Sequence, residues 1–186
     1  MNSLLSSTVS VSRYLEIEKS KDQKAISVFI RERFSERYIQ PMRVEKSLKN
    51  GFTIMAVSCL MIETLESFFQ GWDDTRNKSQ LAFCNFFDRN SEFHFIKGFS
   101  QEFYKHVRCG ILHQAETTGG WHIRRNGEIF SRKSKTINAK KFHDIVEIVL
   151  INYCNDLLVL DWESEFYKNF RKKMKSICNN CSPKKV

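Results

Sequence analysis

The stretch GFTIMAVSCLMIETLESFFQG, residues 51–71, decides the fold of this chain. Its first 12 residues carry no charge, and apolar side chains occupy nearly every side of the helix that it predicts over residues 52–70. A helix that is apolar all round lies at the centre of a protein or in a membrane. The uncharged run stops at Glu63, well short of the roughly 20 residues that a bilayer requires. The sequence therefore predicts a central core helix that ends at Gly71.

Helical spacing extends on both sides of this stretch. Residues 138–160 repeat apolar side chains every three or four positions, which predicts a second long helix, either at the centre of the bundle or in a subunit interface. Residues 12–38 carry one apolar stripe and predict a helix that ends before Pro41. Between them we expect a polar loop over 72–79, a short aromatic helix over 80–88, an irregular link through Gly98, and a helix over 101–116 capped by Ser100. Gly110 inside that last helix costs about 1 kcal/mol relative to Ala, which suggests that backbone or a partner comes close there.

A short β-structure is predicted near residues 121–131. The run WHIRRNGEIF, residues 121–130, places Asn126-Gly127 between two β-prone segments, the strongest short-range signal for a hairpin. A two-residue turn there pairs Arg125 with Glu128 and Ile123 with Phe130. A basic segment over residues 131–141 follows, and we expect Trp121 to pack on the helices with Ile123 and Phe130.

Together these segments predict an all-α fold, an up-and-down bundle of four to five helices with a small β-hairpin insertion. Seven glycines and two prolines are few against a usual combined share of about 12%, which argues against a sandwich or barrel of many short strands. The aromatic content of 13% argues against global disorder. We expect one helical domain over residues 1–167 and a basic C-terminal extension over 168–186, which has seven Lys or Arg and no acid.

The net charge of +9 favours polyanionic partners, but it does not choose among nucleic acid, anionic lipid and acidic protein. The N-terminus MNSLLSSTVSVSR has neither the basic region nor the apolar stretch of a signal peptide. We therefore expect a cytoplasmic protein that does not associate with a membrane.

The cysteines indicate reduced thiols rather than a disulfide framework or a metal site. In a cytoplasmic chain of this size they are expected to be reduced, and Cys59 and Cys154 have the apolar surroundings of core residues. Cys178-Asn-Asn-Cys181 is a single CxxC with no second pair to complete four zinc ligands. We expect a frayed tail at that position.

The segment YKHVRCGILHQAE, residues 104–116, carries the candidate chemistry. Cleavage of RNA by its own 2′-hydroxyl needs a base, stabilisation of the crowded phosphate, and a proton for the leaving oxygen. A histidine such as His113 can accept or donate that proton, and Arg108 presents a planar fork of donors to a phosphate. Because no metal is required for this chemistry, we expect no cofactor and no metal. The chain also lacks the GxSxG pattern of serine hydrolases and the GxxxxGK[ST] pattern of phosphate-binding loops.

In this arrangement the chain resembles the HEPN superfamily over about residues 10–165. Arg108 and His113 form an R-x4-H motif late in a helix, after an apolar helix with Glu63 and Glu66 and before another long helix. The segment from Gly110 to Gln114 is similar to plasmid- and defence-borne members. HEPN proteins are helical bundles, and many are metal-independent RNases of toxin–antitoxin and antiphage systems. The resemblance thus implies an endoribonuclease that acts on RNA as a homodimer, with an antitoxin or defence protein as a further partner.

The resemblance also implies roles for individual residues. Arg108 and His113 would be catalytic, in a composite cleft where two motif helices meet across a two-fold axis, one His acting as base and the other as acid. The motif-supporting candidates are Cys109, Gln114, Glu63 and Glu66. Cys109 departs from the family, which usually has Asn, Asp or His at this position, and a thiol is a weaker hydrogen-bond donor.

Helix geometry limits how the motif residues meet. Five positions on a regular helix turn about 140° and rise about 7.5 Å, so Arg108 and His113 do not share a face. They converge if the helix loosens near Gly110, if Arg108 reaches round it, or if a second copy supplies the partner.

Other interpretations of the same residues stay open. His113 can cap a helix end, Arg108 can pair with Tyr104 or with an acid, and Glu63 and Glu66 can either orient Arg108 or form ordinary buried pairs. The basic group His122, Arg124 and Arg125 can contact RNA backbone or be a solvated surface. The alternative function is a non-catalytic HEPN-like module that binds a partner protein or nucleic acid, and a helical protein outside the family is a third possibility.

Overall fold

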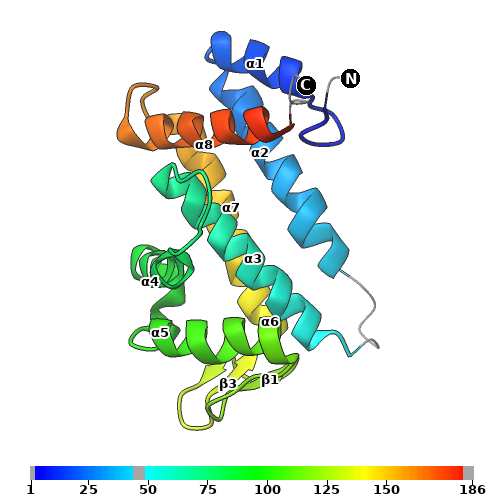
Figure 1. Cartoon of the computed structure of the whole chain (residues 1–186), viewed down its shortest axis with the longest axis vertical. Helices are drawn as coiled ribbons and strands as arrows, with labels where there is room; N and C mark the ends of the chain where they lie inside the picture. Colours follow the sequence, from blue (N-terminus) through cyan, green and yellow to red (C-terminus); the bar gives the residue numbers. More distant parts are fainter. Residues whose placement is uncertain (1–2, 44–48, 182–186) are drawn as a thin grey trace. The chain divides into compact units, whose positions relative to one another are not determined.

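The computed structural model describes residues 3–43 and 49–181 (Figure 1). Within these residues the chain is mostly helical, with eight α-helices, short 3-10 and π-helical segments, and one three-stranded sheet. The mainly helical class predicted from the sequence is therefore confirmed. The chain divides into two compact units: unit 1 holds Met1–Gln40, Ser67–Asp74 and Leu150–Val186, and unit 2 holds Pro41–Glu66 and Thr75–Val149.

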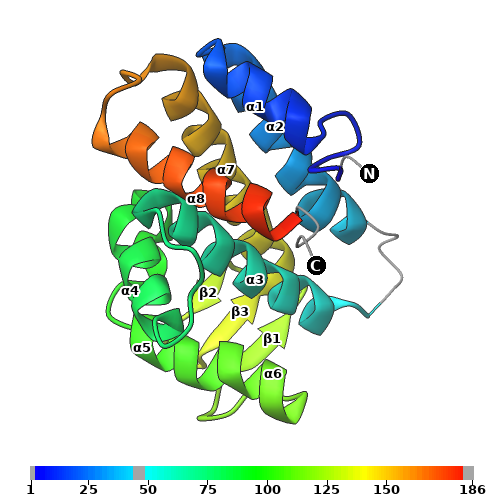
Figure 2. The ribbon, with the colours of Figure 1, turned by 45° about the horizontal axis from the view of Figure 1, so that its top comes forward.

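Unit 1 begins with two helices where the sequence predicts one over residues 12–38. Helix α1 (Val11–Lys19) and helix α2 (Gln23–Phe34) lie side by side, and α2 continues into a π-helical turn over Ser35–Ile39 (Figures 1 and 2). The helix breaks because Lys21 adopts the left-handed conformation, with φ of 55°. Asp22 then starts α2, since its side chain accepts a hydrogen bond from the Ala25 amide at 2.9 Å.

The basic segment from Lys168 is part of the fold of unit 1 as far as Cys181. Helix α8 (Glu165–Cys181) buries Phe170, Met174 and Cys178, which lie four residues apart on one face. The Phe170 ring lies 6.1 Å from that of Phe68. The expectation of a frayed tail at Cys178 and Cys181 is therefore wrong, because the apolar face of α8 secures the segment; residues 182–186 lie outside the described residues.

The helices of unit 2 enclose a core of aromatic rings. Helix α4 (Ser79–Arg89) is followed by a 3-10 segment over Ser91–Ile96, and residues 100–114 form one further helical stretch. Phe103 of that stretch stacks on Phe142, with ring centroids 5.3 Å apart. Phe142 belongs to helix α7 (Ala139–Val159), which starts where the sequence predicts; the Asn138 side chain accepts a hydrogen bond from the Lys141 amide at 3.2 Å.

The sheet of unit 2 differs from the predicted hairpin. Strand β1 (His122–Arg124) pairs in parallel with β3 (Thr136–Asn138), and β2 (Phe130–Ser131) pairs antiparallel with the other side of β3. Figure 2 shows β3 between its two neighbours. The predicted pairing of Ile123 with Phe130 is therefore wrong, since both residues pair with Ile137 instead. Trp121 stacks on Phe130 at 5.5 Å, as predicted.

Helix α3 (Gly51–Gln70) confirms the prediction for the opening stretch. Within the described residues it is the one helix long and apolar enough to cross a membrane, but 61% of its most apolar window is buried inside the protein. That burial is typical of the core helix of a soluble protein. The six cysteines all carry free thiols, and Cys59 and Cys154 are buried as predicted.

Candidate active site around Arg108

The motif lies on a helical stretch with an irregular backbone. Helix α5 (Ser100–Glu102) leads into a π-helical segment over Phe103–Arg108 and then into helix α6 (Cys109–Gln114). Ser100 is the first residue of α5 and Phe99 occupies the cap position, so Ser100 is not the predicted cap. The helix widens before Arg108 and not at Gly110. Short π-helical segments of this kind are frequent at functional sites.

After the end of α6, the backbone of residues 116–118 packs back against the helix. Ala115 adopts a left-handed conformation with φ of 54°, after which the backbone folds back over the helix. A Cβ atom on Gly110 would lie 2.5 Å from the Glu116 carbonyl oxygen and 3.3 Å from Thr117 Cα. The Thr118 amide donates to the His106 carbonyl at 3.0 Å. The close approach that the sequence predicts at Gly110 is therefore made by the chain's own backbone.

Arg108 is held by an acid of the core helix. Its Nε donates to Glu63 Oε1 at 2.8 Å, and the Thr75 hydroxyl donates to Glu63 Oε2 at 3.0 Å. The side chains of Arg108 and Glu63 are 19% and 10% exposed, so water screens this pair less than a surface pair. Burial opposes the charge on Arg108, but the Glu63 carboxylate outweighs it and raises the pKa of Arg108 above its ordinary value.

Both alternative partners of Arg108 are present in the structure. The guanidinium carbon lies 5.6 Å from the centre of the Tyr104 ring, a cation–π distance, while Glu63 forms the ion pair. Glu63 is therefore the acid that orients Arg108.

Glu66 forms an ion pair with a residue outside the motif. Its carboxylate is fully buried and forms an ion pair with Arg89 of α4. Sequence analysis missed Arg89, although a basic residue in the last turn of a short helix is a reasonable partner for a buried acid. Glu66 thus forms the ordinary buried pair that the sequence left open.

The Arg108–Glu63 pair lies in a cavity of about 220 Å³ that we call the Arg108 cavity. Leu60 and Leu112 also line it, although they are 56% and 58% exposed. Burial raises the pKa of Cys59, which keeps its thiol protonated at neutral pH. The lining residues come from α3 and from the motif helix: Ala56, Cys59, Leu60, Glu63, Arg108, Ile111 and Leu112.

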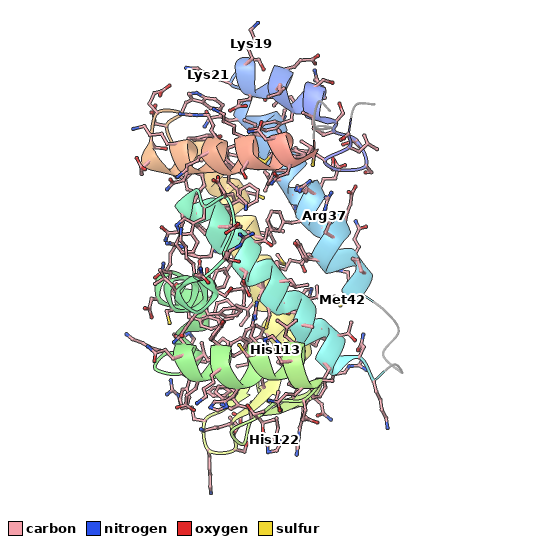
Figure 3. All side chains as sticks on the ribbon, viewed as in Figure 1. Lys19, Lys21, Arg37, Met42, His113 and His122 are labelled. Carbon is pink, nitrogen blue, oxygen red and sulfur yellow. The ribbon has the colours of Figure 1, made fainter. Side chains whose placement is uncertain are left out.

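His113 and Gln114 lie on the exposed last turn of α6, where Figure 3 labels His113. Neither residue lines the Arg108 cavity. Within one chain, the structure therefore does not bring Arg108 and His113 into a common cavity. This agrees with the geometric expectation that the two side chains leave the helix in different directions.

Cys109 lines a different cavity, of about 340 Å³, together with Tyr104 and His106. Burial and a hydrogen bond with the Cys109 thiol raise the pKa of Tyr104. The His106 ring nitrogen Nδ1 lies 2.9 Å from the Thr118 hydroxyl. Cys109 thus interacts with both Tyr104 and Arg108, although it does not line the Arg108 cavity.

The basic candidates near the sheet divide between two hollows of unit 2. Arg124 and Arg125 line one, whereas His122 lines another together with Arg124 and Glu128. Figure 3 labels His122, which β1 presents to solvent. No group of three or more His, Cys, Asp or Glu in residues 3–43 and 49–181 is arranged to hold a metal ion.

Fold and site together define a mainly helical protein with a partly buried Arg–Glu pair beside a helix that ends in an exposed His. Comparison of the chain with models of known protein families, with curated proteins and with solved structures gave no match.

Proposed function

We propose that this protein is a metal-independent endoribonuclease of HEPN type, a toxin or defence effector that acts in the cytoplasm. In this proposal two copies form one cleft, in which Arg108 and His113 promote attack of an RNA 2′-hydroxyl on the adjacent phosphate. An up-and-down bundle arrangement of the helices, and regulation by an antitoxin or other defence protein, belong to the same proposal.

The observation that carries the proposal is the way Glu63 holds Arg108. Glu63 accepts from Nε at 2.8 Å, which orients the guanidinium and its two terminal nitrogens. Those terminal nitrogens are the pair that binds the oxygens of a phosphate side by side. A permanently charged, oriented guanidinium suits the stabilisation of a crowded phosphate in the transition state.

The exposed leucines support a site made by two copies. Leu60 and Leu112 flank the Arg–Glu pair, and each leaves more than half of its surface in water. Exposed apolar side chains that lie together mark a surface suited to contact with another protein. A two-fold axis at α6 would cover these leucines and bring His113 of each copy toward Arg108 of the other.

In such a cleft the roles follow from the side chains. One His113 accepts the proton of the 2′-hydroxyl, and the other donates a proton to the leaving 5′-oxygen. Arg108 stabilises the negative charge on the phosphate between them. The products are a 2′,3′-cyclic phosphate and a free 5′-hydroxyl.

The Cys109 thiol favours a second candidate function, a non-catalytic HEPN-like module that binds a partner protein or nucleic acid. Its side chain is a weak donor and is directed toward Tyr104. In that case the exposed face of α6 is a binding surface, and the Arg108–Glu63 pair is structural.

Cleavage of end-labelled RNA in the presence of EDTA distinguishes the two functions. The wild type should leave cyclic phosphate ends, and Arg108→Ala and His113→Ala should each reduce the rate by about 100-fold or more. Arg13→Ala and His94→Ala remove an exposed Arg and an exposed His elsewhere and should leave the rate unchanged. Intact RNA at high protein concentration, or unchanged cleavage by both motif variants with native circular dichroism, would exclude the ribonuclease.

A further inference from the structure

A second surface of unit 2 gathers several positively charged side chains. A hollow of about 620 Å³ is lined by four cationic side chains, and among its described lining residues none is acidic. We call it the basic hollow, and its lining consists of Lys49, Gly51, Phe52, Ile123, Arg124, Arg125, Asn126 and Lys140.

The cations of the basic hollow come from three separate parts of the sequence. Arg124 ends β1 and Arg125 follows it, Lys140 lies in the first turn of α7, and Lys49 precedes α3. Within the described residues, no ion pair neutralises Lys49, Arg124 or Lys140, and all three are exposed. Gathering like charges in a concave surface raises the local potential and favours a polyanion.

Close packing of the start of α3 against β1 forms the hollow. A Cβ atom on Gly51 would lie 3.3 Å from the Ile123 side chain and 3.4 Å from that of Arg125. Glycine at this position allows the helix start to approach the strand and places Phe52 in the same hollow as Arg124 and Arg125. The Phe52 side chain is 36% exposed.

An aromatic ring beside several cations has a specific chemical use. Proteins that bind single-stranded nucleic acid combine a positive groove for the backbone with aromatic rings on which unpaired bases stack. A lipid surface is a poorer fit, because Phe52 lies in the wall of a hollow and does not project from a convex surface.

We propose that the basic hollow binds single-stranded RNA, with Lys49, Arg124, Arg125 and Lys140 on phosphates and Phe52 stacked on a base. The site is separate from the Arg108 cavity and its binding does not require cleavage. Both lie along one face of α3, since Phe52, Ala56, Leu60 and Glu63 follow helical spacing. Eleven residues of helix separate Phe52 from Glu63 by about 16 Å, so a strand held in the basic hollow can extend toward Arg108.

The test uses a dye-labelled 12-nucleotide 2′-O-methyl oligouridylate, which lacks the free 2′-hydroxyl needed for cleavage. Fluorescence anisotropy at several salt concentrations gives the affinity and its salt slope. The double variant Arg124→Ala/Lys140→Ala should weaken binding about tenfold or more and reduce the slope by about 1.4, since each phosphate contact on a single strand contributes about 0.7. Lys19→Ala/Lys133→Ala, two exposed lysines outside the hollow, should change neither quantity.

The ring of Phe52 is tested separately. Phe52→Leu should weaken binding about tenfold, and Phe52→Tyr should restore it, because stacking depends on the ring. A loss of folding would affect both variants and would appear in their thermal unfolding.

Failure of this proposal is distinguishable from failure of the ribonuclease. His113→Ala should bind the oligonucleotide like the wild type whether or not that variant cleaves RNA. Equal affinity and slope for the wild type and Arg124→Ala/Lys140→Ala would overturn the proposal. So would binding to vesicles with 30% phosphatidylserine in the absence of oligonucleotide binding.

Discussion

Glu63 and Glu66 lie three residues apart on α3 and have different partners. Glu63 pairs with Arg108 and accepts from Thr75, whereas Glu66 pairs with Arg89. From sequence, the two carboxylates are equivalent candidates for orienting Arg108. Which carboxylate pairs with Arg108 depends on which face of α3 contacts α4 and which contacts the helix that carries Arg108. Those contacts are set by tertiary packing and cannot be read from the sequence of α3 alone.

Removal of the charge on Glu63 should destabilise the protein without unfolding it. In Glu63→Gln the amide still accepts a hydrogen bond, but the partly buried Arg108 loses its counter-charge. We expect a loss of about 1–3 kcal/mol in the free energy of unfolding, measured with urea. Glu102→Gln breaks the more exposed pair with Lys135 and should cost less than about 1 kcal/mol. Equal losses would show that Glu63 and Arg108 do not interact through charge.

The Glu32 carboxylate holds the N-terminal loop by hydrogen bonds, and we predict that this attachment depends on pH. Partial burial opposes its ionisation, but hydrogen bonds from Thr8 and Ser7 lower its pKa below the ordinary value. The Thr8 amide donates to it at 3.1 Å. A carboxylate with a lowered folded pKa contributes stability above its unfolded pKa of about 4.3 and loses that contribution as the pH falls through the folded value.

Amide hydrogen exchange at Thr8 checks this anchor. Exchange of Thr8, corrected for the intrinsic effect of pH, should become faster below about pH 4. Glu32→Gln should exchange rapidly at neutral pH as well, whereas the exposed Glu16→Gln should behave like the wild type. Protection at Thr8 that does not depend on pH in the wild type would contradict the assignment.

At the scale of elements, the apolar pattern predicts helices well and fails where pairing is non-local. Residues 51–70 and 139–159 form helices as predicted, because a helix lets their many apolar side chains be buried together. The Asn126-Gly127 signal predicts a local hairpin, yet β3 lies between β1 and β2. Ile137 is fully buried in that middle strand and pairs with both neighbours. Ile137 is the one buried apolar side chain of β3, and the basic residues around the strand hide it from a prediction based on apolar patterns.

The close packing at Gly110 predicts the effect of a methyl group on α6. Gly110→Ala should gain about 1 kcal/mol from helix propensity, but its Cβ would lie 2.5 Å from the Glu116 carbonyl oxygen. Because backbone cannot move as freely as a side chain, we expect a net loss of about 1–3 kcal/mol in urea unfolding. Gln101→Ala, at an exposed position of α5, should stay within about 0.5 kcal/mol. A Gly110→Ala variant that is more stable than the wild type would show that the backbone of residues 116–118 does not pack closely against Gly110.

At the scale of the whole molecule, sequence reasoning predicted contacts of the motif segment better than the cavities around it. Glu63 was one of two acids named as possible partners of Arg108, and a close approach was expected at Gly110. The Arg108 cavity and the basic hollow were not, because each combines side chains from distant segments. Lys49 precedes the long apolar helix α3, and Lys140 lies in the first turn of the long apolar helix α7. This common location at helix starts is the sequence signal that could have indicated that the two lysines lie close together.

Self-association through α6 should depend on the exposed leucines of the Arg108 cavity. Leu112→Glu places a charge at the proposed two-fold interface and should convert a dimer to a monomer in sedimentation velocity. It should also remove RNA cleavage, since the cleft needs both copies. Leu15→Glu introduces the same charge at an exposed position of α1 and should leave the dimer intact. Equal sedimentation of the wild type and Leu112→Glu would exclude this interface.

The most direct measurement of the central claim is RNA cleavage by mixtures of wild-type and His113→Ala chains. Both chains are co-refolded in varied ratios, and the rate is measured in EDTA at constant total protein. If one site needs His113 from each of two copies, the rate should follow the square of the wild-type fraction, with about a quarter of full activity at equal amounts. A rate that falls in direct proportion to the wild-type fraction would contradict a shared cleft, and absence of cleavage by the wild type would contradict the ribonuclease itself.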